Sequence, residues 1–181
     1  IGRAANERSD APTPMDIGLN LPVMAPGLDR TLLYAWCRAI DEGPFSSLAV
    51  GERINFPNPE MTVTISAAAA WTTRVPLFYN VMVLPMHPEA RAAKQIATLD
   101  VLSNGRVVLG VGVGAREDDY AAVGAPWQGR LARLERQVAE LRRLWAGGLA
   151  AGATDPIDPK PVQPGGPKVL MGALFPRAIT R

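Results

Sequence analysis

The chain has 181 residues, of which 48% are hydrophobic, and its 19 Lys and Arg against 17 Asp and Glu give a formal net charge of +2. This composition is typical of a globular protein with one or two domains. Basic residues do not form runs, so we expect neither nucleic acid nor an anionic membrane as a partner. A single cysteine and a single histidine exclude an internal disulfide framework and a zinc site of the usual Cys/His type.

No apolar run reaches the length of about 18 residues that a membrane-spanning helix needs. Residues 1–14 lack the apolar core of a secretory signal, and we expect them to form a flexible tail. The low cysteine content suits a reducing compartment. The predicted location is therefore the cytoplasm, and the predicted partner is a small-molecule substrate.

Apolar residues are arranged in a pattern that predicts alternating strands and helices. Short runs that are apolar almost throughout favour strands buried on both faces. The predicted strands cover residues 15–24, 46–53, 75–85, 106–114 and 168–174. Between them, apolar residues three or four apart predict helices. The predicted helices cover residues 28–43, 58–71, 87–105 and 129–148, and a further helix begins within 175–181.

The residues at the helix ends support these boundaries. Gly43 is placed to stop the first helix, as glycine commonly does just beyond the last turn. Asn58 is the expected N-cap of the second helix, with Pro59 at its first position. Pro88 and Glu89 are expected in the first turn of the third helix, where proline and an acidic side chain are both favourable.

The alternation of strand and helix predicts the α/β fold class with a parallel sheet. Two architectures fit the pattern, a doubly wound sheet and a (β/α)8 barrel. A complete barrel takes about 250 residues, so this chain has room for five or six of its eight units. Residues 147–167 are crowded with Gly, Pro, Ala and Asp, and they are predicted to form a loop excursion.

Three glycines, Gly110, Gly112 and Gly114, lie where a predicted strand ends. Their spacing does not match the G-x-G-x-x-G fingerprint with which dinucleotide-binding folds approach a phosphate. Gly110 and Gly112 are two residues apart, so they lie on the same face of the strand. Two explanations remain open: the glycines make room for a flat cofactor ring, or they allow tight packing inside a barrel.

One long stretch resembles a known family. The segment "HPEARAAKQIATLDVLSNGRVVLGVGVGAREDDYAAVG", residues 87–124, is preceded by "VMVLP" and followed by "RLARLERQVAELRRLWAG". Together with "MDIGLNLP", "LAVGER" and "PKVLMGALFPRAI", these segments closely resemble the bacterial luciferase-like superfamily of flavin- or deazaflavin-dependent oxidoreductases. The resemblance covers essentially everything after the leading tail.

The resemblance implies a (β/α)8 TIM-type barrel, of which residues 15–181 would form about the first five β/α units. It also implies FMN or coenzyme F-420 at the C-terminal ends of the strands, with F-420 favoured by the likeness to Ala-, Arg- and Gly-rich deazaflavin-using members. Segment 75–85 would carry a non-prolyl cis peptide that backs the ring. The implied cofactor-binding residues are Tyr79, Asn80, Val81, Gly110, Gly112, Gly114, Gly172 and Ala173.

Glu52 and Arg53 are the candidate catalytic residues, because related deazaflavin enzymes place polar groups at the end of the second strand. An acid and a base at a strand end can transfer a proton or hold an anionic group. The alternative is a plain ion pair on a loop. His87 directly precedes Pro88 at the start of a helix, which favours a capping or packing role over catalysis. We expect no metal site.

Two function classes follow. The first is a flavin- or deazaflavin-dependent oxidoreductase, either a luciferase-like monooxygenase or an F-420-dependent hydride-transfer enzyme, acting on a small organic substrate. The alternative is a non-catalytic half-barrel that acts through protein association, which is expected if Phe78, Tyr79 and Leu174 fill the cofactor pocket. An open parallel sheet leaves unpaired edges, so a homo-oligomer such as a dimer is also predicted.

Overall fold

The computed structural model describes residues 15–172, which form one five-stranded sheet. The strand order is β1-β2-β3-β4-β5 and all neighbours are parallel, so each strand pairs with the next one along the chain. The strands are β1 (Gly18–Asn20), β2 (Ser47–Val50), β3 (Leu77–Met82), β4 (Val107–Val111) and β5 (Lys168–Met171). Each lies inside a segment that the sequence predicts to be a strand.

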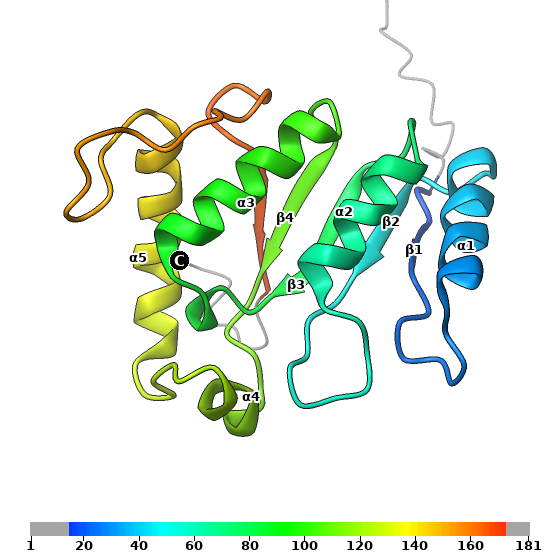
Figure 1. Ribbon diagram of the computed structural model, residues 1–181, viewed down its shortest axis with the longest axis horizontal. Helices are drawn as coiled ribbons and strands as arrows, with labels where there is room; N and C mark the ends of the chain where they lie inside the picture. The colour runs from blue at the N-terminus through cyan, green and yellow to red at the C-terminus, as the bar shows by residue number, and fades with distance from the viewer. Residues whose placement is uncertain (1–14, 173–181) are drawn as a thin grey trace, which may run out of the picture.

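Helices connect the strands, as Figure 1 shows. They are α1 (Arg30–Glu42), α2 (Met61–Trp71), α3 (Glu89–Leu102), α4 (Glu117–Ala122) and α5 (Arg130–Trp145), with a 3-10 turn, η1 (Leu84–Met86). Four of them match predicted helices, whereas α4 was not predicted because its six residues are too few to show an apolar repeat. The predicted tail at 1–14 and the helix start at 175–181 lie outside the described residues.

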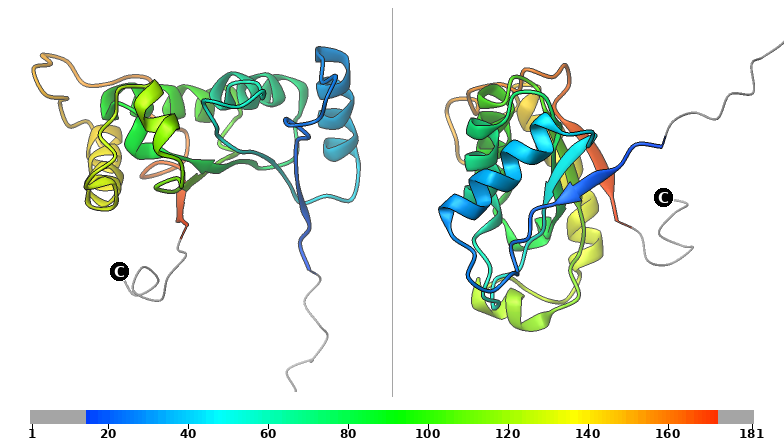
Figure 2. Two further views of the ribbon diagram at one scale, coloured as in Figure 1. Left: turned by 90° about the horizontal axis from the view of Figure 1, so that it is seen from below. Right: turned by 90° about the vertical axis from the view of Figure 1, so that its right-hand side faces the viewer.

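The helices cover one face of the sheet. Seen from below in Figure 2, α2 and α3 lie along one side, and the outer strands β1 and β5 turn down at either end of a curved sheet. A doubly wound sheet would carry helices on both faces. The sequential strand order and the helices on one side are instead those of the first half of a (β/α)8 barrel, so the predicted α/β fold class is confirmed.

Burial of the strand residues follows the same division. Side chains toward the helices have no exposed surface at Leu48, Val50, Leu77, Tyr79, Val107, Leu109 and Val111. The strand register brings a second row together on the opposite face, from Asn20 through Ala49, Phe78 and Val108 to Lys168. Asn20 and Lys168, at the two ends of this row, are exposed. The core therefore lies between the sheet and the helices.

Two helix starts differ from the sequence prediction. The N-cap of α2 is Glu60, whose carboxylate accepts a hydrogen bond of 2.6 Å from the N–H of Val63. Asn58 was predicted for this role, but its side-chain amide donates to the carbonyl of Pro59 instead. Pro88 is the N-cap of α3 rather than its first residue. None of the helices within residues 15–172 is both long and apolar enough to span a membrane.

A buried carboxylate connects α1 to the loop before β3 at the N-terminal edge of the sheet. The Asp41 carboxylate, at the end of α1, accepts hydrogen bonds from the backbone N–H groups of Thr73, Arg74 and Val75. Burial alone would raise the pKa of Asp41, but these hydrogen bonds outweigh it and hold the pKa below its ordinary value. The carboxylate thereby fixes the turn that leads from α2 into β3.

Candidate active site

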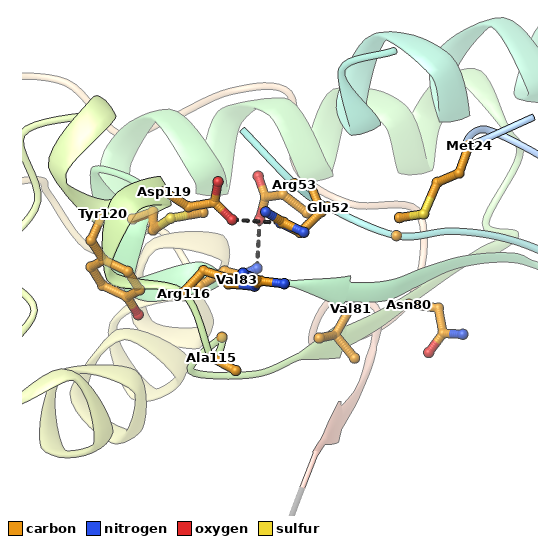
Figure 3. A pocket seen from close by; sticks show the side chains of 13 residues that line it. Met24, Glu52, Arg53, Asn80, Val81, Val83, Ala115, Arg116, Asp119 and Tyr120 are labelled. Carbon is orange, nitrogen blue, oxygen red and sulfur yellow. Dashed lines mark hydrogen bonds and ion pairs between the residues drawn. The ribbon is translucent and has the colours of Figure 1, made fainter. Parts of the chain in front are cut away.

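A cavity of about 360 Å³ opens at the C-terminal ends of β2, β3 and β4. Active sites of barrels with parallel strands are built at this edge. Figure 3 shows the side chains that surround the cavity. They come from the loops after β1, β2 and β4, from the end of β3, from η1 and from α4. The lining residues are Met24, Gly51, Glu52, Arg53, Asn80, Val81, Val83, Met86, Gly114, Ala115, Arg116, Asp119 and Tyr120.

The end of β3 is irregular where it borders this cavity. Asn80–Val81 is a non-prolyl cis peptide, and the register between β3 and β4 shifts between Tyr79 and Met82. The cis peptide that the family resemblance implied for segment 75–85 is therefore present. Asn80 and Val81 both line the cavity.

The β4 glycines accommodate this irregular strand end. A Cβ atom on Gly110 would overlap the carbonyl oxygen of Tyr79, and one on Gly112 would lie 2.9 Å from Cγ2 of Val81. Gly114 has a φ of +63°, which favours glycine, and a Cβ there would lie 2.9 Å from Cγ1 of Val83. Close packing of β4 and the segment after it against β3 and Val83 thus explains all three glycines, and the bulge beside them forms a wall of the cavity.

Glu52 connects the end of β2 to the segment after β3. Its side chain is only 3% exposed. One carboxylate oxygen accepts a hydrogen bond of 2.6 Å from the N–H of Val83, and the other lies 2.7 Å from Nε2 of His87. The backbone N–H of His87 in turn donates to the carbonyl of Leu84, and its own carbonyl accepts a bond from Gln137. Both oxygens of Glu52 are therefore engaged within the protein.

Arg53 connects the same loop to α4. Its Nε donates to Oδ2 of Asp119 at 2.7 Å, while Oδ1 of Asp119 accepts the backbone N–H groups of Ile54 and Asn55. Burial alone would raise the pKa of Asp119. The hydrogen bonds from Asn55, Arg53 and Ile54 and the charge of Arg53 outweigh burial, so the pKa lies below its ordinary value and the carboxylate stays ionised.

A small apolar cluster supports α4 against η1. It contains the buried side chains of Val83, Met86 and Tyr120, with Trp127 packed at its edge. The hydroxyl of Tyr120 donates to the carbonyl of Val113 at 2.7 Å, and its ring meets that of Trp127 edge to face. These contacts fix the loop that presents Ala115 and Arg116 to the cavity.

The structure brings together five of the residues predicted for the site: Glu52, Arg53, Asn80, Val81 and Gly114 line the cavity. Gly110 and Gly112 lie in β4 behind its wall, and the ring of Tyr79 is buried on the helix-covered face, so Tyr79 would reach a cofactor only through its backbone. Gly172 follows β5, and its backbone N–H donates a hydrogen bond to the carbonyl of Val111. Ala173 and Leu174 lie outside the described residues.

Sequence reasoning missed several lining residues, among them Met24, Met86, Arg116, Asp119 and Tyr120. The charged segment after the β4 glycines, "AREDDY", was the available signal for three of them. The pair Arg53–Asp119 is 66 residues apart in sequence, so no local pattern could reveal it. Within the described part of the chain, no group of three or more side chains could hold a metal ion.

The cavity has a size and a lining that suit a small molecule with apolar and polar parts. Its volume lies within the range of about 300–1,000 Å³ that small-molecule sites occupy. Val81, Val83 and Met86 give it apolar walls, while Asn80 and Arg53 supply polar groups. Phe78 and Tyr79, two of the three residues that the non-catalytic alternative placed in the pocket, do not line the cavity, and the third, Leu174, lies outside the described residues.

Comparison with known proteins places the chain in a family. A sequence profile described as luciferase-like monooxygenase matches residues 15–181. An uncharacterized protein of Mycobacterium tuberculosis is 38% identical over 118 residues, which are 61% of this chain and 42% of that protein. An F-420-dependent glucose-6-phosphate dehydrogenase of Beutenbergia cavernae is 42% identical over 88 residues, 46% of this chain and 26% of that enzyme.

Solved structures share the fold. The monooxygenase RslO1 from Streptomyces bottropensis superposes with a TM-score of 0.73 and 26% identity, and the match covers 87% of this chain and 53% of that one. The chain thus spans about half the length of this solved relative and less than half of the curated relatives named above. Because the profile matches nearly the whole sequence and the fold agrees, the chain belongs to the luciferase-like monooxygenase family.

Proposed function

We propose that this chain forms the cofactor-binding edge of an F-420- or FMN-dependent oxidoreductase that acts on a small organic substrate. The observation that carries the proposal is the cavity beside the β3 bulge, at the strand edge where barrels of this kind hold their ligands. Val81, Asn80 and Gly114 would contact the ring, since all three line the cavity. The cofactor, when bound, would supply the hydride or oxygen chemistry.

Coenzyme F-420 is the first choice of cofactor. The similarity to an F-420-dependent dehydrogenase, over a segment 42% identical, supports this choice, and FMN is the second candidate. Gly172 and Ala173 are retained as the proposed contacts for the cofactor phosphate. Gly172 directly follows β5, at the C-terminal edge of the sheet, where the cavity also lies.

The two predicted catalytic residues take different parts in this proposal. Arg53 lines the cavity and uses only its Nε toward Asp119, so its terminal nitrogens are available to orient a bound molecule. Glu52 is nearly inaccessible and holds Val83 and His87. We therefore assign Glu52 a positioning role, in which it fixes the wall of the cavity, and keep Arg53 as the candidate that touches substrate.

The non-catalytic alternative has less support, because Phe78 and Tyr79, two of the three residues expected to fill the pocket, do not line the cavity between residues 15 and 172. The sheet edges suggest a homo-oligomer, since β1 and β5 each pair with one neighbour only within residues 15–172. We propose a cytoplasmic protein whose partners are its own copies and a small-molecule substrate, with no role for nucleic acid or membrane.

Titration of the full-length protein with F-420 and with FMN, followed by fluorescence, tests the proposal. We expect one of them to bind with a dissociation constant in the micromolar range or below. Ala115→Trp would place a large ring at the cavity and weaken binding by about tenfold or more. Ala121→Trp, on the exposed side of α4, is the matched control and should leave affinity unchanged. A folded protein that binds neither cofactor would overturn the proposal.

A further inference from the structure

The anionic side chains of the cavity are buried and engaged by partners within the protein. Glu52 is 3% exposed, and its two oxygens hold Val83 and His87. Asp119 is 6% exposed, and its oxygens accept hydrogen bonds from Arg53, Ile54 and Asn55. A bound molecule would therefore have little direct contact with either carboxylate, because their protein partners lie in between.

The cationic side chains of the same cavity are available. Arg116 is exposed, and its guanidinium makes no hydrogen bond or ion pair with any residue that the structure describes. Arg53 donates through Nε alone, and no residue between 15 and 172 accepts from its two terminal nitrogens. Its side chain is 20% exposed. The accessible charge of the cavity is thus positive, although its total formal charge is balanced.

The side chain of Arg53 and the backbone of Arg116 are held in position. Arg53 is fixed by its ion pair with the buried Asp119. Arg116 is the N-cap residue of α4 and precedes by three positions this same Asp119, which is tied to the loop after β2. Tyr120, buried beside it, anchors the helix through its hydroxyl. Figure 3 shows Arg116 reaching into the region below Glu52 and Arg53.

We infer that Arg116 and Arg53 form a binding site for an anionic group of the substrate, a carboxylate or a phosphate. This inference rests on the proposed function, because it names the class of substrate that the same cavity would take. A guanidinium presents parallel N–H donors that match two oxygens of a carboxylate or a phosphate, and burial on one side strengthens such a bond. Two guanidinium groups that line one cavity would hold a dianion more firmly than a monoanion.

The phosphate of the cofactor is the other anion that could occupy this site. The two sources differ in a measurable way. If the arginines hold the substrate, an inorganic anion should still bind when the cofactor is in place. If they hold the cofactor phosphate, loading with FMN or F-420 should block that anion, and loss of Arg116 should weaken FMN more than riboflavin, which lacks the phosphate.

The test is a calorimetric titration of the full-length protein with inorganic phosphate, with and without bound cofactor. We expect phosphate to bind in both states, and Arg116→Ala to weaken it by about tenfold. Arg116→Lys keeps the positive charge but loses the pair of parallel N–H donors, so it should weaken phosphate binding by less. Arg91→Ala removes the same charge from the exposed side of α3 and should change nothing.

Three results would overturn the inference: phosphate binding unaffected by Arg116→Ala, phosphate excluded by the cofactor, or an FMN-to-riboflavin affinity ratio that falls in the Arg116→Ala variant. Failure of the proposed function has a different signature. In that case neither FMN nor F-420 binds, while the phosphate titration of the cofactor-free protein still reports whether Arg116 holds an anion. Circular dichroism of each variant verifies that the exposed substitution leaves the fold intact.

Discussion

A carboxylate oxygen of Glu52 accepts the backbone N–H of Val83 at 2.6 Å, and this bond joins the end of β2 to the segment that follows the β3 bulge. The two residues lie 31 positions apart in sequence. Val83 follows the cis peptide by two residues and lines the cavity, so the position of this wall depends on a side chain from the neighbouring strand. The acid that resembles a catalytic group in sequence thus has a structural task in the fold.

Removal of this acid should destabilise the protein. Glu52→Ala leaves the N–H of Val83, a buried residue, without its acceptor and takes the partner from His87. An unsatisfied buried donor costs about 1–3 kcal/mol. We expect the free energy of unfolding, measured by urea denaturation of the full-length protein, to fall by that amount. Glu52→Gln keeps one oxygen for Val83 and should lose less.

Glu117→Ala provides the control, because Glu117 is an exposed acid on α4 with no hydrogen bond to another described residue. Its effect should stay within about 0.5 kcal/mol. Equal stability of the Glu52→Ala and Glu117→Ala variants would show that the bond to Val83 contributes nothing.

The packing of Gly112 against Val81 predicts a coupled pair of substitutions. Gly112→Ala brings a Cβ to 2.9 Å from Cγ2 of Val81, which is closer than real contacts allow, and overpacking of this kind costs about 1–3 kcal/mol. Val81→Ala removes that methyl group. Thermal unfolding of the two single variants and of the double variant should therefore show a favourable coupling, with the double variant more stable than the sum of the single effects implies.

A substitution at Gly110 should show no such coupling to Val81. A Cβ at Gly110 would overlap the backbone carbonyl of Tyr79, which no side-chain substitution can remove. Gly110→Ala should destabilise the protein whether or not Val81 is shortened. Gly172→Ala, whose Cβ would be 3.5 Å from the carbonyl oxygen of Val111, is the neutral control. Additive effects at Gly112 and Val81 would contradict the packing explanation.

Most of the fold could be predicted from the sequence because each long element has a local signature. Asp29 and Gly43 flank α1 as N-cap and C-cap, and the apolar runs of β2 to β4 are buried against the helices. The α2 start was misplaced because the side chain that caps it, Glu60, competes with Asn58 two residues earlier. That competition depends on side-chain geometry, which spacing does not encode.

The site could be predicted only in part. The lining residues that the family resemblance located are Glu52, Arg53, Asn80, Val81 and Gly114. The packing role of the glycines could not be predicted, because the group beside each one belongs to β3 or to the residue just after it, 31 positions earlier in the chain (Tyr79, Val81 and Val83). Arg116 was missed because its importance depends on the absence of a partner among the described residues, a property of the folded site.

Cys37 should be protected from alkylation in the native state. The thiol is fully buried, and burial together with the nearby charge of Asp41 raises its pKa to about 11. Because the thiolate is the reactive form, we expect iodoacetamide to modify Cys37 at mildly alkaline pH only when the protein unfolds. Mass spectrometry of the peptide that contains Cys37 gives the extent of reaction. Rapid modification of the folded protein would show that α1 opens away from the sheet.

The Asp41 carboxylate should make stability depend on pH in the acidic range. Its pKa in the folded protein lies below the ordinary value of 3.8, so the stabilisation is fully present above that value and is lost as the pH falls through the folded pKa. Asp41→Asn directs an amide N–H₂ toward backbone donors and should lower the free energy of unfolding at neutral pH. The difference in the free energy of unfolding between the wild type and Asp41→Asn should become smaller below about pH 4. Urea titrations across this pH range measure the difference.

Asp118→Asn, at an exposed position on α4, is the control and should show no such dependence on pH. If the difference in the free energy of unfolding for Asp41→Asn stays constant with pH, the three N–H groups of Thr73, Arg74 and Val75 do not require the charge of the carboxylate.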